Sequence, residues 1–120
     1  MATRALTNAD FATVVSAPGI VLIDFWAAWC GPCQRFAPVY EAASEKHPDV
    51  VFAKVDTDAQ QDIALRFQVR SIPTIMAFRD GLPVFAQAGM LAPAALEAVL
   101  KQVRALDMEK VKSDLAAHKH

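Results

Sequence analysis

Cysteine is scarce in this chain, with only two among 120 residues. A small secreted scaffold held together by disulfides needs a denser set of cysteines, so that class of protein is excluded. An excess of charge of one sign is also missing, because 12 Lys and Arg residues are balanced by 13 Asp and Glu residues. No overall field therefore draws the protein to nucleic acid or to a membrane surface, and partners must be recognised by shape and local chemistry.

Long hydrophobic runs are absent as well. The most apolar run, residues 20–30, is too short to span a bilayer and contains Asp24. Residues 1–7 show no apolar stretch of signal-peptide length, so we expect a soluble, cytoplasmic protein. With 54% hydrophobic residues, the chain nevertheless has enough apolar material for the core of one domain.

Helix and strand patterns alternate through the first two thirds of the sequence. The β-branched and aromatic run over residues 20–26 predicts a strand buried on both faces. Further strands are predicted over 50–55 and 74–78, and helices over 8–17, from Pro32 to Pro48, and over 63–67 with Asp58 as its cap. This βαβαβ order predicts parallel strands joined by helical crossovers, which is typical of α/β proteins.

The remaining third predicts a hairpin and two helices. Asp80-Gly81 is a hairpin turn signal, which folds residues 84–88 back antiparallel. Pro93 opens a helix whose apolar residues recur up to Leu106. We therefore assign residues 1–106 to one domain with a mixed sheet covered on both faces. Residues 107–120 form a C-terminal extension, predicted as a short amphipathic helix that frays at its end.

The two cysteines stand three residues apart in Trp29-Cys30-Gly31-Pro32-Cys33, where the buried strand ends and a helix begins. Residues i and i+3 of a helix are neighbours, so the two thiols can form a disulfide across one turn. The unpaired amides and dipole at the helix start favour an anion, which lowers the pKa of the Cys30 thiol. A Cys30 thiolate can attack a substrate disulfide, and Cys33 can then resolve the mixed disulfide.

Two other uses of the cysteine pair are less favoured. A structural zinc site needs four ligands, and the histidines show no spacing that completes such a set. They are His47, His118 and His120. A purely structural disulfide would close a very small loop, which gains little entropy.

Three other residues have more than one interpretation. Asp24 lies in an otherwise apolar strand, where burial should raise its pKa into a range useful for proton transfer. The alternative is a purely structural acid that is satisfied by hydrogen bonds. Lys54 by itself is a strand-end lysine in solvent. Pro73 precedes a strand and, by itself, is a simple edge breaker.

Several segments of the chain jointly resemble the thioredoxin family. They are Asp24 to Cys33, Ala53 to Asp56, Val69 to Thr74, Asp80-Gly81 and Gly89, within a region from about Leu6 to Leu106. The resemblance implies the thioredoxin fold, an α/β architecture whose central mixed β-sheet of about five strands is flanked by about four helices. It also implies that Cys30 is the nucleophile and Cys33 the buried resolving thiol of a redox-active disulfide.

The resemblance also implies roles for residues around the cysteines. Asp24 would assist deprotonation of Cys33 through water, and Lys54 would pair with Asp24. Pro73 would be cis, which leaves the backbone of Ile72 free to pair with an extended substrate segment. The implied docking surface is flat and mostly apolar, and it consists of Trp29, Gly31, Pro32, Ile72, Pro73 and Gly89.

Some positions depart from the commonest pattern of that family. Gln34 stands where a lysine or arginine is frequent, and Met90 is larger than the usual alanine. These changes leave the redox chemistry intact but affect the preference for partners. Trp26 is predicted to be a packing residue beneath the cysteines.

The function implied by the resemblance is reduction of protein disulfides, which maintains cell redox homeostasis. The protein would be a monomer without a bound cofactor, and electrons would come from NADPH via thioredoxin reductase. Its clients would include ribonucleotide reductase, peroxiredoxin and methionine sulfoxide reductase. Two alternatives stay open: an oxidase or isomerase on the same fold, and a redox-independent binding or chaperone module.

Overall fold

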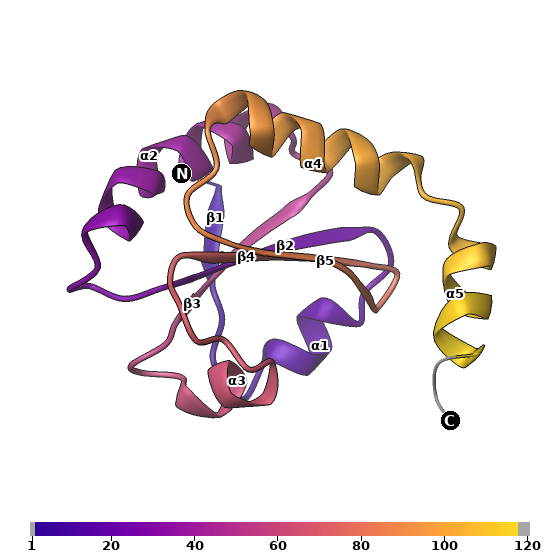
Figure 1. The fold of residues 1–120 in the computed structure, drawn as a ribbon, viewed down its shortest axis with the longest axis horizontal. Coiled ribbons are helices and arrows are strands. Elements are labelled where there is room, and N and C mark those ends of the chain that lie inside the picture. Colours follow the sequence, from indigo (N-terminus) through magenta and orange to yellow (C-terminus); the bar gives the residue numbers. More distant parts are fainter. Residues whose placement is uncertain (1, 118–120) are drawn as a thin grey trace.

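The computed structural model describes residues 2–117, which form a five-stranded sheet with helices on both faces (Figure 1). The strands are β1 (Thr3–Ala5), β2 (Ile20–Trp26), β3 (Val51–Asp56), β4 (Thr74–Arg79) and β5 (Leu82–Ala88). The helices are α1 (Phe11–Val15), α2 (Gly31–Lys46), α3 (Gln61–Arg66), α4 (Pro93–Ala105) and α5 (Met108–Ala117). The strand order is β1-β3-β2-β4-β5, and the predicted α/β class with a mixed sheet is confirmed.

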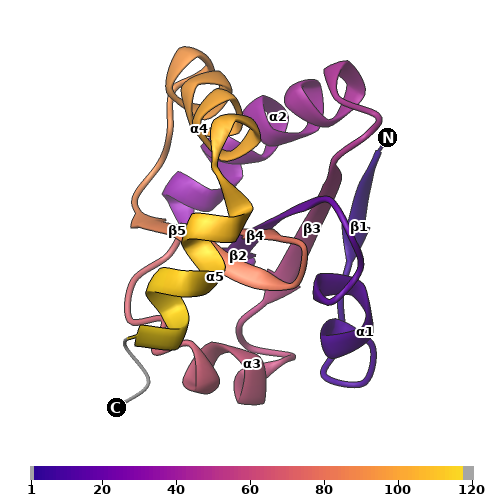
Figure 2. The same ribbon diagram turned by 90° about the vertical axis from the view of Figure 1, so that its right-hand side faces the viewer.

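Strand β2 forms the centre of the sheet and contributes to two hydrophobic clusters. Leu22 packs in a cluster with residues of α2 and α4, among them Phe36 and Leu100. Ile23 packs in a second cluster with residues of α1 and α3, among them Phe11. Helices α2 and α4 therefore cover one face of the sheet and α1 and α3 the other (Figure 2). The prediction that this strand is buried on both faces is confirmed.

The direction of β4 differs from the prediction. Strands β1, β3 and β2 are parallel, but β4 pairs with β2 in the antiparallel direction. The segment that connects β3 to β4 explains the difference. Its helix, α3, has only six residues and spans about 9 Å, whereas a six-residue strand spans about 20 Å. A helix this short does not return the chain to the far end of the sheet, so β4 starts at the end where β3 stops.

The N-terminal edge strand β1 is absent from the sequence-based prediction. It pairs with β3 in parallel, and the amide of Leu6 continues the pairing by donating to the carbonyl of Lys54 at 2.9 Å. Three residues are too few for a periodic pattern, so the pairing is set by the tertiary structure.

Helix α1 is shorter than the predicted helix over 8–17. The expected capping residues are nevertheless in contact: the Thr7 amide donates to Asp10 Oδ1 at 2.7 Å, and the Asp10 amide donates to Thr7 Oγ1 at 3.3 Å. This reciprocal pair holds a turn just before the helix, which begins at Phe11.

The predicted hairpin between β4 and β5 is confirmed. Asp80 and Gly81 both have positive φ, at 52° and 84°, as the turn signal requires. The Asp80 side chain also fixes the turn against the start of β2, because its Oδ1 accepts from the Gly19 amide at 2.8 Å.

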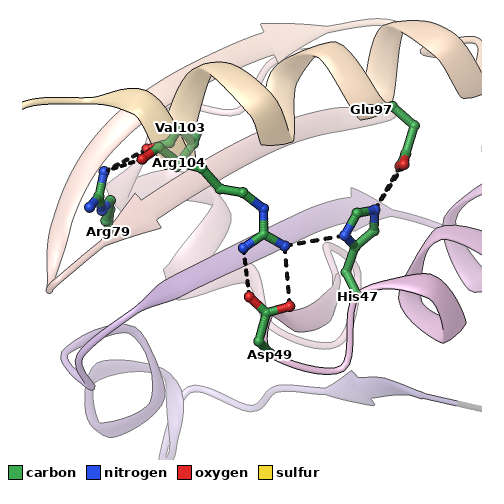
Figure 3. A network of polar contacts seen from close by, with 6 residues as sticks. All are labelled: His47, Asp49, Arg79, Glu97, Val103 and Arg104. Atoms are coloured by element: carbon green, nitrogen blue, oxygen red, sulfur yellow. Dashed lines mark hydrogen bonds and ion pairs between the residues drawn. The ribbon is translucent and has the colours of Figure 1, made fainter.

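The end of α4 is attached to β4 by one arginine (Figure 3). Nη1 of Arg79 donates to the carbonyl oxygens of Val103 at 2.8 Å, Arg104 at 3.1 Å and Leu106 at 2.9 Å. A helix leaves most of its last carbonyls without backbone partners, and Arg79 donates to three carbonyls at this end, of which that of Val103 also accepts from the Leu106 amide. Leu106, which was expected to point inward along the helix, is the C-cap residue and is half-buried.

A second set of contacts joins α4 to the segment after α2 (Figure 3). Arg104 forms a bidentate ion pair with Asp49, with Nη1 2.6 Å from Oδ2 and Nη2 3.1 Å from Oδ1. Nη2 also lies 3.2 Å from Nδ1 of His47. Since a guanidinium only donates, Nδ1 must accept, and the ring proton is on Nε2, 2.8 Å from Glu97. These contacts fix the tautomer of His47.

Helix α5 lies within the C-terminal extension of residues 107–120, where the sequence predicts a short amphipathic helix. It has no fully buried residue, and the fraying expected at residues 118–120 lies outside the described residues. Among the helices of residues 2–117, none is both long and apolar enough to cross a membrane.

Replacing Arg79 by Leu should lower the free energy of unfolding by about 1–3 kcal/mol, because the carbonyls at the end of α4 lose a charged donor. Urea unfolding followed by circular dichroism measures this difference. An Arg4→Leu variant, changed at an exposed position of β1, is the control and should stay close to the parent. Equal stability of the Arg79→Leu variant and the parent would show that the three contacts contribute nothing.

Candidate active site

The two cysteines lie where β2 gives way to α2. Cys30 is the N-cap residue of α2, and Gly31 and Pro32 open the helix. Cys30 and Cys33 form a disulfide across this first turn, with their Cα atoms 5.2 Å apart. The amide of Cys33 donates to Sγ of Cys30 at 3.2 Å. The predicted proximity of the two thiols at a helix start is therefore confirmed.

The loop before β4 lies against this disulfide. The Ile72–Pro73 peptide bond is cis, and the carbonyl oxygen of Ile72 is 3.7 Å from Sγ of Cys30. The amide of Gly89 donates to the carbonyl of Pro73 at 2.8 Å, which attaches the end of β5 to the same loop. The structure thus brings residues from three distant segments together around Cys30.

Trp29 is the most exposed aromatic side chain at this site, with 71% of its surface accessible. Its Nε1 donates to Oδ2 of Asp58 at 2.9 Å. The predicted role of Asp58 as the cap of α3 is wrong, because Gln60 is the N-cap residue and makes no side-chain capping bond. The carboxylate instead holds the indole ring, a contact for which the sequence offers no local signal.

Asp24 lies within β2 and is only 1% exposed. Neither of its carboxylate oxygens has a hydrogen-bond partner among the residues that the structure describes. Burial penalises the charged form and raises the pKa of this carboxyl from 3.8 to about 7, although the positive charge of Lys54 opposes part of the rise. The predicted elevation of the Asp24 pKa agrees with this environment.

Lys54 is opposite Asp24 in the pairing of β2 with β3. Within the described part of the chain, the two side chains form no direct ion pair, and Nζ of Lys54 lies 4.9 Å from the centre of the Trp26 ring. Lys54 therefore influences the Asp24 carboxyl through its charge rather than by a hydrogen bond. Trp26 packs against the cluster formed by Ala27 and the two cysteines, as predicted.

Gln34 makes a contact that its position alone does not reveal. Its Nε2 donates to the carbonyl oxygen of Ala28 at 2.9 Å. The side chain thereby connects the first turn of α2 to the loop that precedes Cys30. No group of three or more His, Cys, Asp or Glu side chains capable of holding a metal is found among residues 2–117.

Comparison with known proteins identifies the family of this chain. The sequence profile described as Thioredoxin matches residues 2–102, nearly the whole described chain. The chain belongs to the thioredoxin family. Thioredoxins are thiol-disulfide oxidoreductases without a bound cofactor, and the Cys30–Cys33 pair of this chain has the spacing that this activity requires.

Individual relatives agree with this assignment. The thioredoxin of Mycobacterium bovis is 48% identical over 104 residues, which cover 85% of this chain and 90% of its own. The structure of Plasmodium falciparum thioredoxin superposes with a TM-score of 0.78 at 33% identity, covering 83% of this chain and 98% of its own. A Mycobacterium leprae protein named bifunctional thioredoxin reductase/thioredoxin is 47% identical over 93 residues, which cover 76% of this chain and 20% of its own.

Replacing Asp24 by Asn should stabilise this thioredoxin at high pH. Between pH 3.8 and about 7 the folded state binds the Asp24 proton more tightly than the unfolded state, so this group makes stability fall as the pH rises. A rise of the pKa from 3.8 to about 7 lowers the free energy of unfolding by roughly 4 kcal/mol at pH values above that window. Urea unfolding of the oxidised protein is measured at pH 4, 6 and 8, values chosen to bracket this window. The free energy of unfolding of the variant should rise progressively relative to that of the parent as the pH increases.

The control for this measurement is Asp62→Asn, since Asp62 is exposed in the first turn of α3. It should show no comparable gain at high pH. A difference between Asp24→Asn and the parent that stays constant with pH would contradict the assignment of a buried, proton-binding carboxyl.

Proposed function

We propose that Cys30 is the attacking thiolate and Cys33 the resolving thiol of a protein-disulfide reductase. The observation that carries this proposal is the hydrogen bond from the Cys33 amide to Sγ of Cys30 at the start of α2. In the reduced protein the same amide would face a Cys30 thiolate, and the helix dipole would add to the stabilisation of its charge.

The reaction consists of two exchanges. The Cys30 thiolate attacks one sulfur of a client disulfide, forms a mixed disulfide and releases the other client sulfur as a thiolate. Cys33 then loses its proton and attacks Cys30, which releases the second client thiolate and leaves the Cys30–Cys33 disulfide. Two electrons pass from the protein to the client, and the protein must be reduced again before the next cycle.

We assign Asp24 to the second exchange, as the group that assists deprotonation of Cys33. A buried carboxyl with a pKa of about 7 can accept a proton near neutral pH and release it later. Lys54 is a positioning residue in this scheme, because its charge lowers the pKa of the Asp24 carboxyl and so keeps part of it ionised. The absence of a hydrogen-bond partner for Asp24 within residues 2–117 supports a role other than fold stabilisation.

Clients would dock on the surface around Cys30, with an extended segment pairing with the backbone of Ile72. The other members of this docking surface are Trp29, Gly31, Pro32, Pro73 and Gly89. The 3.7 Å between the Ile72 carbonyl and Sγ of Cys30 supports the assignment, since a strand paired there would bring its own sulfur close to Cys30.

Electrons would come from NADPH through a thioredoxin reductase. The relative whose name joins both activities in one chain supports such a partnership. We propose the cytoplasm as the location, because a reductant of disulfides works where thiols are kept reduced. The clients would be enzymes that finish a cycle with a disulfide, such as ribonucleotide reductase, peroxiredoxin or methionine sulfoxide reductase. The protein would act as a monomer through the domain of residues 1–106.

The roles of the cysteines can be tested with a matched pair of variants. Cys33→Ser should accumulate a mixed disulfide with a disulfide-containing peptide, because the resolving thiol is missing. Cys30→Ser should form no such adduct, because its remaining thiol lacks the position at the helix start. Intact-mass measurement detects the adduct, and an adduct on Cys30→Ser alone would reverse the two roles.

The direction of electron flow is tested by the redox midpoint of the Cys30–Cys33 pair at pH 7, followed by tryptophan fluorescence in dithiothreitol buffers. A midpoint below about −250 mV is expected, because a reductant must lie near or below the glutathione pool at about −220 to −260 mV. A midpoint above about −200 mV would instead favour work as an oxidase or isomerase. If the titration showed no two-electron transition, only the interpretation as a redox-independent binding module would remain.

A further inference from the structure

A cationic side chain lies at the rim of the docking surface. Arg35 is exposed on α2, one turn after Gly31. Its Nη1 is 3.4 Å from the position that a Cβ on Gly31 would occupy. Residues i and i+4 of a helix are neighbours, and side chains point back toward the helix start, so the guanidinium lies over the turn that carries the disulfide.

No partner neutralises the charge of Arg35 within residues 2–117. It makes no hydrogen bond or ion pair with any residue that the structure describes. Two other arginines do have partners, since Arg79 holds the end of α4 and Arg104 pairs with Asp49. The guanidinium of Arg35 is therefore free to bind a group from outside.

The residue before Arg35 contributes no charge to the docking surface. Gln34 is neutral, and its amide is used inside the site by donating to the carbonyl of Ala28. Before Cys30 in the chain, Trp29 donates through its indole to Asp58, so a carboxylate lies beside Trp29. The docking surface is therefore electrostatically asymmetric, with the positive charge of Arg35 beside Gly31 and the negative charge of Asp58 beside Trp29.

We propose that Arg35 selects clients by binding a carboxylate of the client chain close to the cysteine under attack. The partner is an extended protein segment with Asp or Glu beside its disulfide, since guanidinium and carboxylate form paired, charge-assisted hydrogen bonds. This inference rests on the proposed reduction of client disulfides. It adds a specificity-determining residue to the reaction and leaves the exchange chemistry to the two cysteines.

The test uses two synthetic peptides that contain the same disulfide and differ only in Glu or Gln beside the attacked cysteine. Oxidation of the prereduced protein by each peptide is followed by tryptophan fluorescence at low salt. The parent should react about twofold to fivefold faster with the Glu peptide, the range expected for one exposed ion pair. In Arg35→Gln the ratio of the two rates should fall to about one, as it should for the parent at high salt.

Two further variants make the test specific. Arg35→Lys keeps the charge and should retain part of the preference for the Glu peptide. Lys101→Gln removes one positive charge from an exposed position on α4 and should leave the ratio of the parent unchanged.

The outcomes separate this inference from the proposed function. An unchanged ratio in Arg35→Gln, or an equal loss in Lys101→Gln, would overturn the assignment to Arg35 while reduction of both peptides upheld the proposed function. If the parent reduced neither peptide, the proposed function would fail and the selectivity would fail with it.

Discussion

The burial of β2 on both faces is the constraint on which the rest of the structure depends. A strand in this position must be covered by helices on each side, which α2 and α4 supply on one face and α1 and α3 on the other. Because α2 follows β2 after only four residues, its first turn is held at the end of the best-packed element of the sheet. The disulfide therefore lies on a rigid support, although it is close to the surface.

The same burial gives Asp24 its unusual chemistry. An exposed carboxyl would be ionised and inert at neutral pH, whereas this carboxyl is shielded from solvent inside the sheet and its pKa rises to about 7. The cost is borne by fold stability, since the position would hold an apolar residue more favourably. A buried carboxyl that titrates near neutral pH and a core of maximal stability place opposite demands on this strand.

Much of this architecture follows from local sequence signals, and the exceptions have identifiable causes. The run over 20–26, the Asp80-Gly81 turn and the Cys30 to Cys33 spacing are local patterns, and each led to a correct prediction. The direction of β4 depends on the span of α3, and β1 exists only through its pairing with β3. The contacts of Asp58 and Gln34 join segments through side-chain geometry, which no spacing rule describes.

The contacts between Arg79 and the carbonyls at the end of α4 also determine where the molecule can be joined to a support or to another protein. Arg79 is at the end of β4 that pairs with Ile20, whereas the disulfide follows the opposite end of β2. Helix α5 therefore leaves the domain at the pole opposite the cysteines (Figure 1). A solid support, a fluorescent reporter or a fused protein joined through α5 would leave the reactive end of the molecule facing outward.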